Sequence, residues 1–236
     1  MIAAQSVKEQ VACACRILAL EGYADLTLGH VSARPPGEVV IQIKRRGVGL
    51  DEVEPDDVVP LDPEDDEAFD SPEMHLEAVL HTEVYRARPD VGAVIHGHPP
   101  HATALAACQA ELSLLTHDAV LFADGLALFE DTPELITGPQ LGQAVARALG
   151  ARRVVLMRNH GVLVVGKDLG WAVLAAVTLE RAVRIQAIAS ALGPLQPISR
   201  EWAERMYPEK YNDRLVDEYW AAWVRKVRRR RVGPGD

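Results

Sequence analysis

Three histidines at the ends of two apolar runs constrain this chain more than any other feature. His96 and His98 close the run over 91–95, and His160 follows the run over 154–157. Because side chains alternate along a strand, His96 and His98 point to the same side of a strand that ends there. A third imidazole from a second strand end could complete a three-histidine face around a divalent metal. Such a face leaves one coordination position open, which is the arrangement of a catalytic metal site.

Length and composition set the broad class of the protein. The chain has 236 residues, 48% of them hydrophobic and 25% charged, which is ordinary for a globular domain with a sizeable core. A net charge of −9 disfavours a nucleic-acid partner, and we interpret the Arg228–Arg231 run as a solvated end of the chain. No apolar run approaches the roughly 20 residues that cross a bilayer, so no membrane partner is expected.

Cysteine usage indicates the compartment. Cys13, Cys15 and Cys108 show no metal-ligand spacing and no disulfide framework. The N-terminus also lacks a basic stretch followed by a long apolar one, so no signal peptide is evident. These features predict a cytoplasmic protein in a reducing environment.

Strand and helix patterns alternate along the chain. Helices are expected over 3–22, 73–88, 101–108, 138–149 and 168–191, and strands over 27–34, 38–43, 91–97, 153–157 and 162–166. The acidic, proline-rich segment 51–70 is expected to form a surface excursion with one short strand near Val58, and a helical tail is expected from about residue 198. Neither a repeat nor a glycine-rich phosphate loop interrupts this order, which predicts a single layered α/β domain over 1–236.

Several motifs occur together in a specific order. They are Gly29-His30-Val31-Ser32-Ala33-Arg34, then Glu77-x3-His81-x3-Tyr85-Arg86-Ala87-Arg88-Pro89-Asp90-Val91, then Ala93-Val94-Ile95-His96-Gly97-His98, and finally Asn159-His160-Gly161. With these motifs, residues 5–195 resemble the class II aldolase/adducin family. The resemblance implies an α/β fold, a three-layer α/β/α sandwich with a central mixed and largely antiparallel sheet. It also implies a homotetramer with active sites near subunit interfaces.

The resemblance assigns roles to four residues. It makes His96, His98 and His160 the ligands of a divalent metal, usually Zn²⁺, with Mn²⁺, Co²⁺ or Fe²⁺ as other possibilities. It makes Glu77 the catalytic acid and base, and burial is expected to raise its pKa toward a useful range. The alternative is that Glu77 is a surface carboxylate on a helix, with Glu73 and Glu83 as rivals for the catalytic role.

His81 and Tyr85 follow Glu77 at i+4 and i+8, on the same face of the expected helix. We interpret them as packing and orienting groups rather than as catalysts.

This chain departs from the family's sugar-phosphate aldolases where they bind phosphate. Those enzymes use an asparagine, a Thr-Gly pair and a Ser-Ser pair, and here the corresponding positions hold His30, Arg46-Gly47 and His75-Leu76. The substrate is therefore expected to be a small carboxylate rather than a phosphosugar, because arginine and histidine hold carboxylates well. The predicted substrate-binding set is His30, Ser32, Arg45, Arg46, Gly47 and His75. The alternative for Lys44-Arg45-Arg46 is a solvated loop.

His30 also matches a Gly-His-x-Ser-x-Arg subgroup that resembles the dihydroxyphthalate-type decarboxylases. The tail adds a weaker indication, since it holds 6 of the 12 aromatic residues of the chain. In the family a C-terminal tyrosine of a neighbouring subunit can reach the active site, which makes Tyr211 or Tyr207 a candidate. His117 falls where the family has a His-Tyr pair with a similar role. Packing of the tail helices explains the tyrosines equally well.

The leading hypothesis is a metal-dependent carbon–carbon lyase. It decarboxylates a hydroxylated, aromatic acid through a metal-stabilised enolate, with Glu77 delivering the proton and His30 and Arg45 or Arg46 positioning the carboxylate. One alternative is retro-aldol cleavage of a non-phosphorylated hydroxy-keto acid or sugar-like substrate. Others are an iron-dependent oxidative decarboxylase and a non-catalytic module like the head domain of adducin, a class that lacks the metal ligands.

Overall fold

A computed structural model of the chain describes residues 6–231 and contains one mixed sheet. Its order is β3-β2-β1-β4-β7-β6-β5, and all neighbours are antiparallel except β5 and β6. The strands are β1 (His30–Ala33), β2 (Ile41–Lys44), β3 (Val58–Leu61), β4 (Ala93–Gly97), β5 (Ala127–Phe129), β6 (Val154–Met157) and β7 (Gly161–Gly166). The predicted mixed, largely antiparallel sheet is confirmed.

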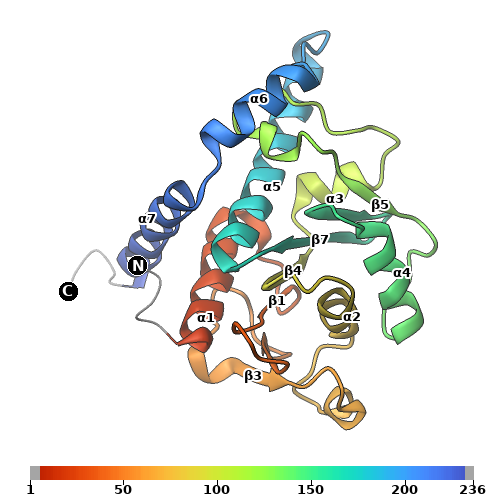
Figure 1. Cartoon of the computed structure of the whole chain (residues 1–236), viewed down its shortest axis with the longest axis vertical. Coiled ribbons are helices and arrows are strands. Elements are labelled where there is room, and N and C mark those ends of the chain that lie inside the picture. Colours follow the sequence, from red (N-terminus) through yellow and green to blue (C-terminus); the bar gives the residue numbers. More distant parts are fainter. Residues whose placement is uncertain (1–5, 232–236) are drawn as a thin grey trace.

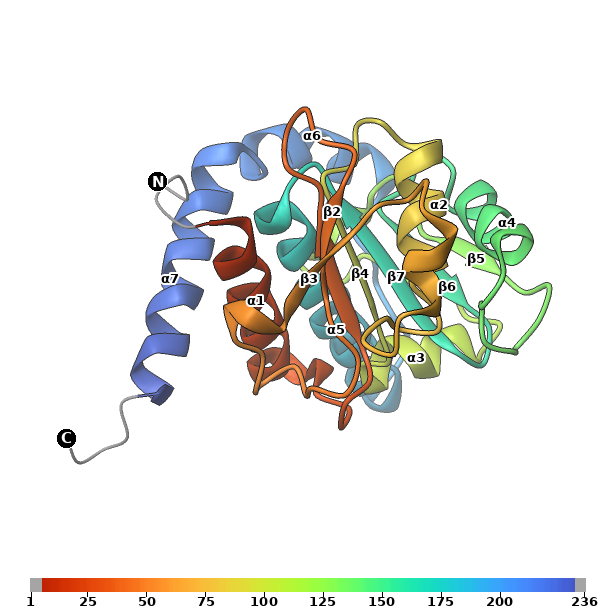
Figure 2. The ribbon, with the colours of Figure 1, turned by 90° about the horizontal axis from the view of Figure 1, so that it is seen from below.

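Helices cover both faces of this sheet. They are α1 (Val7–Leu18), α2 (Val79–Ala87), α3 (Pro100–Ala106), α4 (Pro139–Leu149), α5 (Leu169–Leu192), α6 (Arg200–Lys210) and α7 (Asp213–Arg231). Short helical turns are η1 (Ala19–Tyr23), η2 (Pro55–Asp57), η3 (Asp66–Asp70) and η4 (Ala119–Phe122). Figure 2 shows α1 and α5 on one side of the sheet and α2 and α4 on the other, which confirms the three-layer α/β/α sandwich.

The pleat of the central strand β4 divides the core in two. Ile95 packs into the cluster that β4 shares with α1, α3 and α5, whereas Val94 packs into the cluster with α2 and α4. Since His96 is two residues after Val94, it points to the α2 side. His96 lies opposite His30 of β1 and Leu163 of β7. The pairing of β1 with β4 therefore places His30 beside His96.

The first helix is shorter than the sequence pattern indicates. Ser6 caps α1 by accepting from the Glu9 backbone N–H, and the predicted start at residue 3 lies outside the described residues. The helix was expected to end at Gly22 but ends at Leu18, where a π-type turn follows. Gly22 lies in this turn with a φ of +101°, which glycine adopts readily.

The helix expected over 73–88 begins only at Val79. The preceding residues form tight turns, in which the Ala78 and Leu80 N–H groups donate to the carbonyls of His75 and Glu77. Glu77 therefore lies in a turn before α2, and the expectation that it shares a helical face with His81 and Tyr85 is wrong. Strand β5 was not expected either, because three residues are too few to show an alternating pattern.

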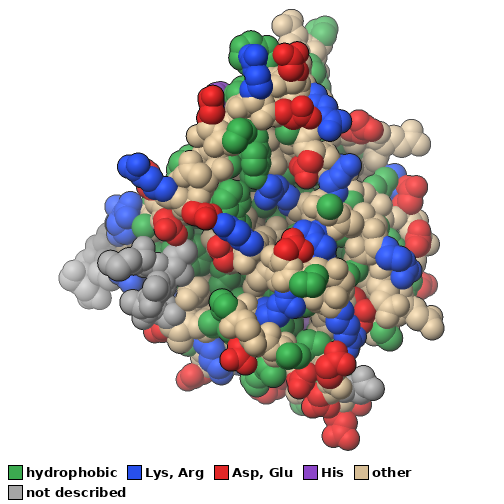
Figure 3. Space-filling view, in the orientation of Figure 1, with side chains coloured by type: hydrophobic (Ala, Val, Ile, Leu, Met, Phe, Trp, Pro, Cys, Tyr) green, Lys and Arg blue, Asp and Glu red, His purple; other side chains and the backbone are tan. Residues whose placement is uncertain are grey.

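The C-terminal helices pack on the α1 and α5 side, as Figure 1 shows for α7. Trp220, Trp223 and Val227 of α7 are buried in the larger core cluster. Over the face shown in Figure 3, Lys and Arg are interspersed with Asp and Glu. None of the described helices combines the length and apolar character that a membrane span requires.

Candidate metal centre and active site

The three predicted metal ligands converge on one point. One ligand nitrogen from each of His96, His98 and His160 lies within 4.8 Å of the other two. His96 lies in β4 and His98 directly follows that strand, whereas His160 lies in the turn between β6 and β7. The β4–β7 pairing explains the convergence, because Gly97 is opposite Val162 and this brings the turn beside the histidine pair.

In His96 and His98, hydrogen bonds occupy Nδ1 and leave Nε2 available to a metal. His96 Nδ1 donates to the Val162 carbonyl at 3.0 Å, and His98 Nδ1 donates to Asp25 Oδ2 at 3.0 Å. Each Nδ1–H is therefore fixed and each Nε2 carries a lone pair. The Nε2 atom of His96 and both ring nitrogens of His160 are buried without a hydrogen-bond partner among the described residues. Three imidazoles that converge on one point, two of them with buried nitrogens that lack a partner, are a donor set that fits a divalent metal such as zinc.

The glycine after His160 is required by close packing. A Cβ atom at Gly161 would lie 2.6 Å from Cδ2 of His98 and 2.7 Å from the Gly97 carbonyl oxygen. Asn159, just before the histidine, adopts a φ of +56°, a left-handed conformation that asparagine tolerates better than most residues. The Asn-His-Gly sequence therefore builds the tight turn that brings His160 to the other two ligands.

Glu77 faces this histidine cluster. Its Oε2 atom lies 3.6 Å from His96 Nε2, and its Oε1 atom lies 3.4 Å from His160 Nε2. Oε1 also accepts from the Ile136 backbone N–H at 2.8 Å, which ties the carboxylate to the loop before α4. Burial raises the pKa of Glu77, but the His160 side chain, His96 and this N–H outweigh it and lower the pKa below its ordinary value. The expected raised pKa is therefore wrong, because these contacts reverse the effect of burial.

Beside the cluster lies a cavity of about 190 Å³. It is lined by Thr27, Leu28, Gly29, His30, Arg46, His75, Leu76, Glu77, His96, His98 and Leu135. The side chains of Leu28, Leu76 and Leu135 are 49%, 55% and 53% exposed, so the mouth of the cavity is apolar while its floor is made of imidazoles. A planar apolar ring can rest against such a rim with its polar groups toward the histidines.

A buried cation lies behind the cavity wall. Lys44 is fully buried, and its Nζ atom is 3.3 Å from His75 Nε2 and donates to the Thr27 and Arg45 carbonyls. None of the described carboxylates forms an ion pair with it. Burial lowers the pKa of Lys44 to about 8, and burial together with the Lys44 charge lowers the pKa of His75 to about 3. An uncompensated positive charge therefore lies next to a neutral imidazole of the cavity wall.

The other predicted substrate-binding residues lie at different depths. His30 lines the cavity, and Ser32 lies behind it, where its Oγ atom contacts His81 and Tyr85. Arg46 lies at the cavity, whereas Arg45 is paired with Asp57 at 2.8 Å outside it.

Gly47 follows Arg46 as an exposed turn residue with a φ of +84°, and it does not line the cavity. The structure therefore brings His30, His75 and Arg46 to the histidine cluster, and does not bring Ser32, Arg45 or Gly47 into contact with the cavity.

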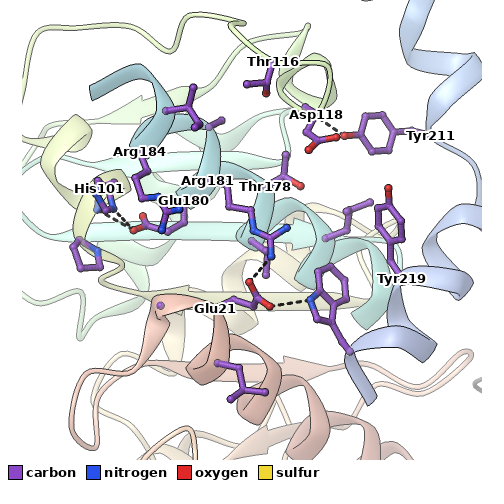
Figure 4. A pocket seen from close by; sticks show the side chains of 18 residues that line it. Glu21, His101, Thr116, Asp118, Thr178, Glu180, Arg181, Arg184, Tyr211 and Tyr219 are labelled. Atoms are coloured by element: carbon purple, nitrogen blue, oxygen red, sulfur yellow. Dashed lines mark hydrogen bonds and ion pairs between the residues drawn. The ribbon is translucent and has the colours of Figure 1, made fainter. Parts of the chain in front are cut away.

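His117 and Tyr211 lie away from this cavity within one chain. Tyr211 is buried and its hydroxyl donates to the Asp118 carbonyl at 2.8 Å, while His117 lines a separate surface pocket beside α6 and α7. Tyr211 lines a larger pocket of about 720 Å³ between α5 and α7, in which Glu21 and Arg181 form an ion pair. Figure 4 shows these side chains. The contribution of His117 and Tyr211 to the site from a neighbouring subunit remains a prediction.

Sequence similarity identifies the family. Residues 9–187 match the Class II Aldolase and Adducin N-terminal domain. The chain belongs to the class II aldolase/adducin family, as its motifs predicted. It is 33% identical over 205 residues to a protein of Arthrobacter keyseri named 3,4-dihydroxyphthalate decarboxylase, an alignment that covers 81% of this chain and 82% of the relative.

Two further relatives show the breadth of the family. A protein of Streptomyces roseochromogenus subsp. oscitans, named 4-hydroxy-3-prenylphenylpyruvate oxygenase/4-hydroxy-3-prenylbenzoate synthase, is 33% identical over 153 residues, which are 64% of this chain. The chain spans only about half of that relative, 55% of its length. A solved structure of an aldolase II superfamily protein from Pseudomonas syringae matches with a TM-score of 0.82 and 26% identity, covering 94% of this chain and 92% of the other.

Sequence reasoning missed two contributors to the site, Asp25 and the Ile136 N–H, and left open whether Lys44 is solvated. Asp25 fixes His98, the Ile136 N–H holds Glu77, and Lys44 is buried rather than solvated. Lys44 is the last residue of β2 and directly follows the strand expected over 38–43. Its place next to that strand was the signal that its side chain is ordered. Asp25 and Ile136 lie in loops that no periodic pattern marks.

Proposed function

We propose that this protein is a divalent-metal-dependent carbon–carbon lyase that decarboxylates a hydroxylated aromatic acid. His96, His98 and His160 would hold the metal, which would supply a Lewis acid for substrate oxygens. We propose zinc as the metal, a cytoplasmic location, and a homotetramer in which His117 and Tyr211 approach the site of a neighbouring subunit. The named decarboxylases and the aldolase fold among the relatives support a lyase.

The observation that carries the proposal is the Glu77 carboxylate, which faces the Nε2 atoms of His96 and His160. These two nitrogens have no other partner among the described residues, and His98 lies beside them. Oε1 is held by Ile136 and Oε2 is free at 3.6 Å from His96. A carboxylate held ionised can accept the proton of a substrate hydroxyl when the substrate binds. When the bond to the carboxyl carbon breaks and CO₂ leaves, the electron pair stays on the ring carbon. Glu77 then returns the same proton to that carbon, so the step balances without a co-reactant.

The cavity wall supports an acidic and aromatic substrate. The buried Lys44 charge and Arg46 at the cavity attract an anion, and neutral His30 can donate a hydrogen bond to it. The three leucines of the mouth offer apolar surface to a ring. The positions at which the family's sugar-phosphate aldolases have an asparagine, a Thr-Gly pair and a Ser-Ser pair hold His30, Arg46-Gly47 and His75-Leu76 here, which disfavours a phosphosugar.

A product assay tests the proposal against its rivals. The zinc-loaded protein is offered a panel of hydroxylated benzoic and phthalic acids together with aliphatic hydroxy-keto acids, and CO₂, carbonyl products and oxygen uptake are measured. Decarboxylation predicts CO₂ from an aromatic acid without an aldehyde, a ketone or oxygen uptake. Release of a carbonyl product without CO₂ would make the protein an aldolase instead, and oxygen uptake under ferrous iron would make it an oxidative decarboxylase.

A further inference from the structure

A chain of hydrogen bonds runs from the cavity into the core between β1 and α2. His30 Nδ1 lies 2.6 Å from His81 Nε2, and His81 Nδ1 lies 2.6 Å from Ser32 Oγ. Ser32 Oγ lies 2.9 Å from the Tyr85 hydroxyl. All four side chains are at most 3% exposed, so water does not replace any of these bonds. At the cavity, this hydrogen-bond network ends with the Nε2 atom of His30, because Nδ1 is already bonded to His81.

The Ser32 hydrogen has two possible acceptors, and each choice gives this hydrogen-bond network one direction. The Ser32 hydroxyl has one hydrogen, so it donates either to Tyr85 or to His81. If it donates to Tyr85, each hydrogen bond of the network is donated in the direction away from the cavity. His30 then has a lone pair on Nε2. If it donates to His81, the hydrogen bonds are donated toward the cavity and His30 presents an N–H.

Tyr85 decides between these directions. Across residues 6–231, Ser32 Oγ is the one acceptor found within hydrogen-bond distance of its buried hydroxyl. A buried hydroxyl hydrogen without an acceptor is unfavourable, so Tyr85 donates to Ser32. Ser32 then donates to His81 Nδ1, and His81 Nε2–H donates to His30 Nδ1. The single proton of neutral His30 is left on Nε2, facing the cavity.

We infer that Tyr85, Ser32 and His81 fix His30 as a neutral hydrogen-bond donor that binds the substrate carboxylate. Tyr85, Ser32 and His81 are positioning residues in this account, which rests on the proposed function. A neutral donor suits a carboxylate that leaves as CO₂. A full cation at this point would stabilise the bound carboxylate more than the transition state, in which the negative charge moves into the ring.

Nitrogen NMR of the histidine rings tests this inference without turnover. The full-length, zinc-loaded protein is labelled with ¹⁵N-histidine, and the His30 and His81 signals are assigned from His30→Gln and His81→Gln variants. We expect both rings to carry their proton on Nε2, with Nδ1 unprotonated. Protonation of Nδ1 in both rings, a doubly protonated His30, or a zinc-shifted His30 Nε2 would overturn the inference. If no acid is turned over, the spectra still test His30, so the two failures are distinguishable.

Tyr85→Phe tests the positioning role. Without the phenol hydrogen, both directions of the chain become available, so the rings should show mixed tautomers. The KM for the acid substrate should rise about 10-fold, with a smaller change in kcat and with zinc content unchanged. Ser32→Ala should have the same effect on KM, and it serves as a second variant if Tyr85→Phe folds poorly. Tyr219→Phe, which removes a hydroxyl on α7 that does not line this cavity, is the control. Unchanged tautomers and unchanged KM in both site variants would contradict the positioning role.

Discussion

The Glu77 carboxylate and the His96 imidazole face each other at 3.6 Å between Oε2 and Nε2, and both side chains are buried. The contact joins a turn before α2 to the end of the central strand. Because Nδ1 of His96 donates to the Val162 carbonyl, the nitrogen nearest Glu77 is also the one available to a metal. A base and a metal position therefore lie on the same side of one cavity, and the predictions below depend on that relationship.

Replacing Glu77 by Gln should abolish turnover and leave metal bound. The amide keeps the shape of the side chain but cannot carry a proton, so kcat should fall about 10²- to 10⁴-fold. Metal content and kcat are measured on the same preparation. Glu73→Gln is the matched control, because Glu73 is an exposed carboxylate four residues earlier. Full activity in Glu77→Gln would remove Glu77 from the role.

Adding one methyl group at residue 161 should damage the metal site. The Cβ atom of Gly161→Ala would come within 2.7 Å of His98 Cδ2 and of the Gly97 carbonyl oxygen, so His98 or the β4–β7 pairing must shift. We expect metal affinity to fall at least 10-fold and the free energy of unfolding to fall by about 1–3 kcal/mol. Gly138→Ala, which meets no atom within 4 Å, should leave metal affinity unchanged. Titration with zinc compares the two variants.

The charge on Lys44 should govern affinity for the acid substrate. Lys44→Met should raise the KM about 10-fold, which is about 1.4 kcal/mol of binding. Because burial lowers the pKa of Lys44 to about 8, the wild-type KM should rise above pH 8, and this rise should be absent in the variant. Lys167→Met, which removes an exposed lysine paired with Asp213, is the control. Equal pH profiles of KM in wild type and Lys44→Met would contradict this role.

Raising the pH should weaken substrate binding through Lys44, but it should increase the stability of the folded protein. In the unfolded chain its pKa returns to about 10.5, so the unfolded state binds more protons than the folded state between about pH 8 and 10.5. The Lys44 contribution to the free energy of unfolding therefore increases with pH in that window. Below pH 8 the cost of burying the cation is fully present. Denaturant unfolding of wild type and Lys44→Met across this range measures the difference, which should shrink as the pH rises.

The leucines at the cavity mouth should select for a ring. Leu28→Ser with Leu135→Ser removes exposed apolar surface, so the KM for an aromatic acid should rise about 10-fold while that for an aliphatic acid of equal charge changes little. Leu192→Ser, at the far end of α5 and 84% exposed, should change neither. An equal loss for both substrate types would mean that the leucines do not contact a ring.

The sequence predicted those parts of the site that lie in a strand with alternating side chains or in a recognisable motif. Alternation along β4 placed His96 and His98 on one side, and the Asn-His-Gly turn placed His160, because register follows from strand pairing. The layers of the sandwich followed from the interleaved helix and strand patterns. The helix boundary before Val79 did not follow, since apolar periodicity continues through turns whose hydrogen bonds span three residues rather than four.

Tertiary contacts explain the remaining differences. Ser32 was expected at the substrate, but strand alternation in β1 and the packing of α2 place its hydroxyl between His81 and Tyr85. The pKa of Glu77 depends on His160 and Ile136, which lie far away in the chain and are brought close only by folding. Burial alone, which the sequence could indicate, predicts the opposite direction.

Metal content measured together with turnover tests the central claim most directly. The wild-type protein is loaded with zinc, its metal is counted per chain, and CO₂ release from a hydroxylated aromatic acid is followed before and after dialysis against chelator. We predict one zinc per chain, loss of turnover with loss of metal, recovery on adding zinc back, and failure of His160→Ala to retain zinc. A metal-free protein that releases CO₂ at the full rate in chelator would contradict the account.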